Sequence, residues 1–81
     1  MPRYYFHFES HGVRLRDDVG IALPDAEAAW YQAVRSAQDL IRAEKSLGCS
    51  FLEQLVAIED DQGAPVDKVP LEEIARFAAG L

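Results

Sequence analysis

The chain has 81 residues, which is enough for one domain with one hydrophobic core and too few for two. Apolar residues make up 49% of it and charged residues 27%, and this ordinary globular composition excludes a disordered or collagen-like chain. Fourteen acidic residues against eight Lys and Arg residues give a net charge of −6, which disfavours a general binder of nucleic-acid backbones.

The sequence also indicates the cellular compartment in which the protein is expected. The single cysteine, Cys49, cannot form an internal disulfide, which fits a reducing environment. No uncharged stretch approaches the ~20 residues that a membrane-spanning helix requires. Arg3 is followed only by residues 4–8 before Glu9, too short for the apolar part of a signal peptide. We therefore expect a cytoplasmic protein without a membrane partner.

The N-terminal segment alternates as a β-strand does, with apolar residues on one side at Tyr4, Phe6 and Phe8. Turn-forming residues follow at 10–12, and alternation resumes over residues 13–16. We expect an antiparallel hairpin whose inward face carries Phe6, Phe8, Val13 and Leu15. The opposite face then carries Tyr5, His7, Arg14 and Arg16. Residues 17–20 continue as a loop or a short extension.

A long amphipathic helix is predicted next. Asp25 suits the N-cap, where its side chain accepts a hydrogen bond from a free backbone N–H. Gly48 is expected to end the helix after about twenty residues, a length of about 30 Å. Tyr31 is expected to be exposed. Apolar residues recur at three- and four-residue steps and are expected to face the core, Trp30 included: Ala26, Ala29, Trp30, Ala33, Val34, Ala37, Leu40 and Ile41.

The C-terminal third predicts a second hairpin and a short helix. The branched run at residues 55–58 indicates a strand, residues 60–63 a tight turn, and residues 65–69 an edge strand, where Pro65 is tolerated. Pro70 suits the first turn of a last, short helix. The order β-β-α-β-β-α predicts a single α+β domain over residues 1–81. In it, one antiparallel sheet packs on one long helix in two layers, and one sheet face stays uncovered.

No pattern indicates catalysis or a cofactor. His7 and His11 have no further histidine or cysteine pair beside them to complete a metal site. Cys49 follows the C-terminal end of the predicted helix, where the helix dipole opposes a thiolate. Glycine-rich phosphate loops are absent from the sequence. We therefore expect a protein that is not an enzyme and takes no cofactor or metal, with His7 half-exposed on the sheet.

The most informative cluster is the one predicted on the uncovered sheet face, which comprises Tyr5, His7, Arg14 and Arg16. Aromatic and guanidinium groups together are enriched in protein interfaces, and they could also hold a small anion or a stacked base. A solvated face without a partner is the competing interpretation. We expect a small interaction module that self-associates or binds a protein partner through the open sheet face or a strand edge. The net charge makes nucleic acid the less favoured partner.

Residues 1–8 and 16–25 resemble a family of short bacterial proteins of unknown function. Members of that family begin with an MPRYFF-like strand and continue with a D-x-x-G-x-x-L-P-D segment. The resemblance extends into residues 57–63 and 69–70 and so covers most of the chain. It implies no activity, because the family has no assigned reaction or catalytic residue.

A weaker, fold-level similarity is to antitoxin domains of the HicB type. In these domains a hairpin, a Pro-Asp segment and an alanine-rich helix follow in the same order, and the acidic protein binds a basic RNA-cleaving toxin. The present chain lacks the usual P-G-C-like loop and a separate DNA-binding tail, and function does not travel with fold. The alternative function is therefore an inhibitor of a small basic nuclease, with an acidic surface that includes Glu53, Glu59, Asp60 and Asp61.

Overall fold

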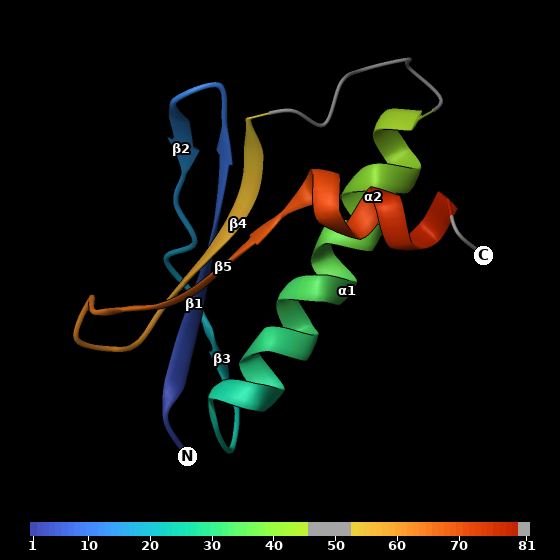
Figure 1. Ribbon diagram of the computed structural model, residues 1–81. Helices are drawn as coiled ribbons and strands as arrows, with labels where there is room; N and C mark the ends of the chain where they lie inside the picture. Colours follow the sequence, from blue (N-terminus) through green and yellow to red (C-terminus); the bar gives the residue numbers. More distant parts are fainter. Residues whose placement is uncertain (46–52, 80–81) are drawn as a thin grey trace.

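The computed structural model describes residues 1–45 and 53–79, which form two layers, an antiparallel sheet and a long helix packed against it (Figure 1). The predicted α+β class is confirmed, and one short strand, β3, adds to the expected order. Gly48 and Cys49 lie outside the described residues. The elements are β1 (Arg3–Ser10), β2 (Val13–Leu15), β3 (Ile21–Ala22), α1 (Ala26–Lys45), β4 (Gln54–Glu59), β5 (Pro65–Pro70) and α2 (Leu71–Ala79).

The strands follow the order β2-β1-β4-β5, and β3 also pairs with β1. All of these pairs are antiparallel. Phe8 pairs with Leu15 of β2, and Tyr4 pairs with Ile21 of β3. Tyr4 and Phe8 are an even number of residues apart, so their backbone groups point to the same side of β1. Strands β2 and β3 therefore share one edge of β1, and residues 16–20 (loop 16–20) connect them along it.

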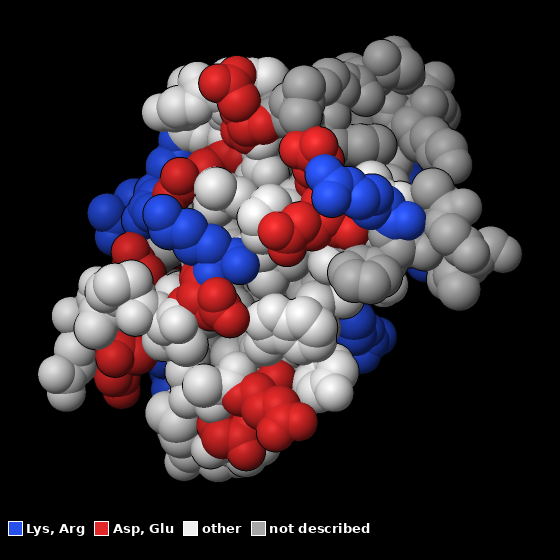
Figure 2. Space-filling model, viewed as in Figure 1, with Lys and Arg blue, Asp and Glu red and all other residues white. Residues whose placement is uncertain are grey.

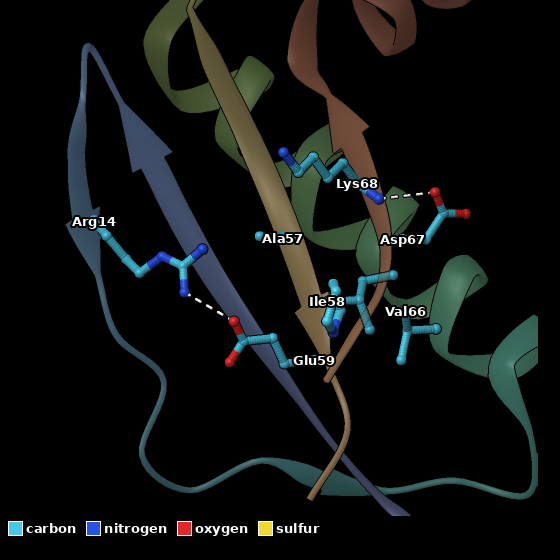
Figure 3. Close-up of a pocket in the computed structure, with 8 residues that line it drawn as sticks. Arg14, Ala57, Ile58, Glu59, Val66, Asp67 and Lys68 are labelled. Carbon is cyan, nitrogen blue, oxygen red and sulfur yellow. Dashed lines mark hydrogen bonds and ion pairs between the residues drawn. The ribbon is translucent and has the colours of Figure 1, made fainter. Parts of the chain in front are cut away.

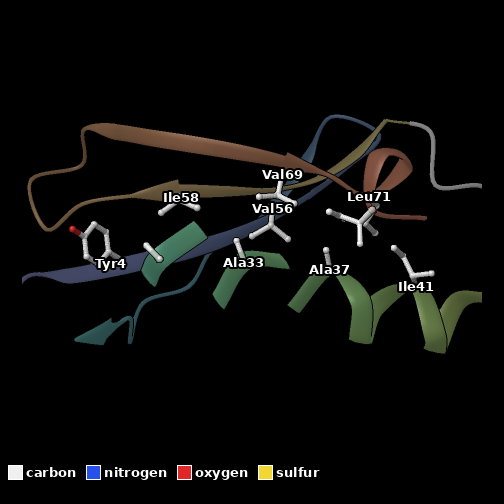
Figure 4. Close-up of a cluster of buried hydrophobic side chains, with 10 residues drawn as sticks. Tyr4, Ala33, Ala37, Ile41, Val56, Ile58, Val69 and Leu71 are labelled. Carbon is white, nitrogen blue, oxygen red and sulfur yellow. The ribbon is translucent and has the colours of Figure 1, made fainter. Parts of the chain in front are cut away.

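Helix α1 buries a narrow stripe of small residues against the sheet. Ala29, Ala33 and Ala37 are fully buried at four-residue spacing, and Ile41 continues the stripe. Such small side chains allow the helix axis to approach the sheet closely. The stripe packs against core residues of the sheet and of α2 (Figure 4), which are Tyr4, Val56, Ile58, Val69, Leu71 and Ile74.

The predicted N-cap of α1 at Asp25 is confirmed, whereas the predicted placement of Trp30 in the core is wrong. Asp25 Oδ1 accepts a hydrogen bond from the Ala28 N–H at 2.8 Å, as expected of an N-cap. Trp30 was predicted in the core, but 40% of its surface is exposed. Its direction differs by about 100° from that of Ala29, which is the residue that meets the sheet, so Trp30 lies on the flank of the helix. Tyr31 is exposed, as predicted, and contacts the Trp30 ring edge to face.

The first hairpin forms as predicted, but its second strand is not covered. Val13 and Leu15 share the face of Phe8, yet each is 63% exposed. The reason is that α1 packs over β4 and β5, whereas β2 is the outermost strand on the other side. Arg16, which was predicted within this strand, lies after its end, in loop 16–20.

Within residues 1–45 and 53–79, no helix combines the length and the apolar character needed to cross a membrane.

Candidate functional site

The four residues predicted as a binding surface lie around the open face of the sheet, which is the face opposite α1. Tyr5 and His7 alternate with core residues along β1, and Arg14 of β2 is paired with Glu9 on the same face. Tyr5, His7 and Arg16 line one hollow of about 300 Å³, and Arg14 lines another of about 340 Å³. The four residues are brought near one another, but they do not all line one hollow.

His7 is buried, with only 2% of its surface exposed, although the sequence predicted a half-exposed residue. Its Nδ1 accepts a hydrogen bond from the Asp17 backbone N–H at 3.0 Å, and its Nε2 lies 3.0 Å from Glu59 Oε1. Since Nδ1 is an acceptor, the proton of the neutral ring is assigned to Nε2, which donates to Glu59. Tyr5 stacks on the ring, with centroids 6.5 Å apart. Both nitrogens are engaged, so neither is free in this arrangement to act as a base or metal ligand.

Glu59 connects three strands. It accepts hydrogen bonds from His7 of β1 and from Arg14 of β2, whose Nη1 lies 3.0 Å from Glu59 Oε2. Arg14 also donates to Glu9 through Nε at 2.9 Å and through Nη2. The hydrogen bond from Arg14 lowers the pKa of Glu59, with a smaller contribution from His7. The hydrogen bond to Glu9, followed by that to Glu59, raises the pKa of Arg14.

Asp17 fastens loop 16–20 to β1. Its Oδ2 accepts a hydrogen bond from the Phe6 N–H at 3.1 Å, in the gap between β2 and β3. Its Oδ1 accepts from the N–H groups of Val19 and Gly20 at 3.0 and 3.1 Å. Burial of the carboxylate opposes ionisation, but the hydrogen bonds from Gly20, Phe6 and Val19 outweigh it and lower the pKa of Asp17. The Asp17 side chain thus provides the hydrogen bond to the Phe6 N–H that a paired strand would otherwise provide.

Gly20 packs tightly against β1. Its φ is +72°, and a Cβ there would lie 2.9 Å from Arg3 Cγ, the Tyr4 carbonyl oxygen and Tyr5 Cε1. Arg3 Nη1 donates to the carbonyl groups of Val19 and Gly20 at 2.9 and 3.2 Å. Only glycine combines this backbone conformation with this little space.

The first hollow is strongly acidic. Besides Tyr5, His7 and Arg16, it is lined mainly by carboxylates, those of Asp17, Asp18, Glu59, Asp60 and Asp61. Arg16 lies 3.8 Å from Asp18, and both side chains are exposed. In the described part of the chain, no group of three or more His, Cys, Asp or Glu residues is placed to hold a metal ion.

The second hollow lies over Ala57 of β4, whose small side chain leaves a depression in the open face. Arg14 of β2 reaches across β1 toward this depression, Lys68 of β5 approaches it from the other side, and Glu59 borders it (Figure 3). Basic and acidic side chains are interleaved over the face seen in Figure 2. That face therefore offers no broad basic surface of the kind that phosphate backbones require.

Sequence reasoning missed Asp17 and Glu59 as the residues that organise this region. The signal for Asp17 was the D-x-x-G spacing, since an Asp carboxylate commonly accepts backbone N–H groups two or three residues further on. Glu59 had no comparable local signal, because its partners His7 and Arg14 are 52 and 45 residues away in the chain.

Comparison with known proteins places the chain in a family. No curated protein and no solved structure matches it. Residues 3–72 match the model of the family described as Domain of unknown function (DUF6894). This range runs from the first residue of β1 to the start of α2 and includes loop 16–20. The chain therefore belongs to the DUF6894 family, a domain of unknown function, and the expected membership of a family without an assigned activity is confirmed.

Proposed function

We propose that the domain is a small protein-interaction module that binds its partner along the outer edge formed by β2, loop 16–20 and β3. The observation that carries this proposal is a row of exposed apolar side chains. Val13, Leu15 and Ile21 lie on one edge and on one face of the sheet, and each is exposed in spite of its apolar character. We call these three residues the apolar edge. Val13 and Leu15 lie next to one another on β2, and Ile21 lies further along the same edge, where it pairs with Tyr4. Exposed apolar groups gathered at one edge are a mark of interaction sites.

The polar network on the other face supports this edge. In this network, Glu59 accepts hydrogen bonds from His7 and Arg14. His7 also accepts one from the Asp17 N–H, and the Asp17 carboxylate accepts one from the Phe6 N–H. Such a network fixes the position of β2 and loop 16–20 relative to β1. A contact surface that is held rigid before binding loses less conformational entropy when the partner binds.

The predicted surface of Tyr5, His7, Arg14 and Arg16 takes a different role in this proposal. His7 is buried and cannot touch a partner, and Tyr5 is half-buried against it. Arg14 and Arg16 remain exposed beside the apolar edge. Charged residues at the rim of an interface affect partner choice more than affinity.

The inhibitor alternative has less support. It requires carboxylates that are free to face a basic enzyme, but Glu59 is bound to Arg14 and His7. Asp60 accepts hydrogen bonds from the Gln62 and Ala64 N–H groups of its own turn. The other two acidic residues of that predicted surface, Glu53 and Asp61, are exposed.

The test compares two variants that add the same charge. Leu15→Glu places a carboxylate in the apolar edge, whereas Gln62→Glu places one in the exposed turn between β4 and β5. Tagged full-length protein is expressed at its natural level, and retained proteins, including an untagged copy of the chain, are quantified. We expect Leu15→Glu to lose a protein that wild type and Gln62→Glu both retain. Equal retention by all three forms would overturn the proposal.

A further inference from the structure

The geometry points to a second copy of this chain as the partner, bound by antiparallel pairing of β2 with β2 around a two-fold axis at Arg14. This inference rests on the proposed function and names its partner. In the resulting dimer, the two sheets join into one continuous sheet through their β2 strands.

The backbone of β2 is suited to this pairing. The turn at His11 and Gly12 has φ values of +51° and +83°, as in the two-residue hairpin loops of type I′. In such a hairpin the pair that closes the loop, Ser10 with Val13, is the hydrogen-bonded one. Arg14 is in the next pair, so its N–H and C=O point away from β1. Since β2 is the outermost strand on this side among the described residues, these two groups face outward.

A two-fold axis at Arg14 makes the side chains of β2 complementary to themselves. The N–H of each Arg14 donates to the carbonyl of the other, and Val13 of each copy comes opposite Leu15 of the other. These apolar pairs fall at positions without hydrogen bonds, where Cβ atoms approach to about 4.5–5.5 Å. Both pairs lie on the core-side face of the sheet, where Leu15 is the neighbour of Phe8, a residue that packs against the core.

The charges at the axis are balanced within each copy. The two Arg14 side chains meet on the open face, where like charges would repel. Each guanidinium, however, already has carboxylate partners in its own chain, Glu9 and Glu59. What remains is the repulsion between two chains of net charge −6, which salt screens within about 8 Å at physiological ionic strength. The dimer should therefore tighten as salt rises, unlike a complex held by ion pairs.

The opposite edge of the sheet does not offer the same pairing. Pro65 and Pro70 at the two ends of β5 have no N–H to donate. The Lys68 N–H is already bonded to the Asp67 carboxylate at 2.8 Å. Pairing of β2 with β5 of another copy would extend without closing, so these features favour the closed two-fold dimer.

The first experiment is sedimentation equilibrium of the purified full chain at several concentrations and salt levels. We expect a monomer–dimer equilibrium that shifts toward dimer with salt. Leu15→Glu should weaken it at least about 100-fold, because the substitution occurs twice in a symmetric interface. Gln62→Glu should leave it unchanged. A dimer that survives Leu15→Glu overturns the inference.

A second measurement tests the register. In a Cys49→Ser background, Arg14→Cys places two thiols on the axis, with Cα atoms about 5.5 Å apart and within disulfide reach. We expect a cross-linked dimer under mild oxidation. Val13→Cys should not cross-link, because each Val13 faces Leu15 of the other copy. Cross-linking at Val13 instead of Arg14 overturns the register.

The two proposals can fail separately. If wild type stays monomeric at all concentrations while Leu15→Glu still loses a different protein in the capture experiment, self-pairing is wrong and the interaction module stands. If wild type is monomeric and no protein is lost, both proposals are wrong.

Discussion

The two outer edges of the sheet are built differently. At β5, two prolines and the bond from the Lys68 N–H to Asp67 remove backbone donors that another strand would need. At β2, the backbone groups of Arg14 point outward between two exposed apolar residues, Val13 and Leu15. Natural sheets protect their edges against unwanted pairing. This protein protects one edge and leaves the other open, and the open edge is where we place its function.

The two edges of the sheet also differ in the hydrogen bonds that hold them in place. The turn before β5 is closed within itself, by hydrogen bonds from Gln62 and Ala64 to Asp60. The β2 side depends on side chains that reach across strands, from Asp17 to Phe6 and from Arg14 to Glu59. Matched substitutions should therefore cost more stability on the β2 side than on the β5 side.

The largest expected difference in stability is between alanine substitutions at two glycines with similar backbone angles. Gly20 and Gly63 have φ values of +72° and +78°, but only Gly20 has atoms within 3 Å of an added Cβ, whereas Gly63 has none within 4 Å. Gly20→Ala should lower the free energy of unfolding by roughly 3–4 kcal/mol, the sum of backbone strain and overpacking. Gly63→Ala should cost about 1 kcal/mol. Urea denaturation measures both, and equal costs would show that loop 16–20 is not packed on β1 as described.

His7 provides the next largest effect. His7→Phe keeps a ring beside Tyr5 but removes both hydrogen bonds and leaves the Asp17 N–H without its partner. We expect a loss of about 2–3 kcal/mol. His7→Asn places an amide oxygen near the position of Nδ1 and should recover part of that loss if the Asp17 bond matters. Denaturation curves in which Asn is no better than Phe would argue against the bond.

Asp17 should give a smaller effect that depends on pH. The lowered pKa values of Asp17 and Glu59 mean that near pH 4 the unfolded state binds more protons than the folded state. Stability is then fully present above the ordinary carboxylate pKa and falls as pH drops through the folded values. Asp17→Asn should cost about 1–2 kcal/mol at pH 7 and flatten this fall.

The control for Asp17 is Asp60→Asn, since the hydrogen bonds that Asp60 accepts from Gln62 and Ala64 lie within its own turn. We expect this variant to cost less at pH 7 than Asp17→Asn. Urea midpoints measured between pH 7 and pH 3 compare wild type with both variants. A pH slope that is the same for wild type and Asp17→Asn would contradict the assigned role of the carboxylate.

Local patterns were sufficient to predict most of the fold. Alternation identified β1, the branched run at residues 55–58 identified β4, the turn at residues 60–63 pointed to β5, and the Asp25 cap with the apolar stripe identified α1. Trp30 and the pair Val13 and Leu15 were placed wrongly for one physical reason. Periodicity indicates which face a side chain is on, but it does not reveal how far the covering helix extends over that face.

The candidate site was harder to predict than the fold. The sequence placed Tyr5, His7 and Arg14 on one face, but it could not show that His7 is buried. That burial depends on loop 16–20 and on Glu59, which is 52 residues away. Contacts between distant segments have no periodic signal, so the hydrogen-bond network could be recognised only in the assembled fold.

The most direct test of the open edge is amide hydrogen exchange at Arg14, followed by NMR as the protein concentration rises. If β2 pairs with a second copy, exchange of the Arg14 N–H should slow as dimer forms. Exchange of the Lys68 N–H, on the protected β5 edge, should stay constant and serve as the internal reference. An Arg14 N–H that exchanges equally fast at every concentration, while sedimentation detects dimer, would contradict the account.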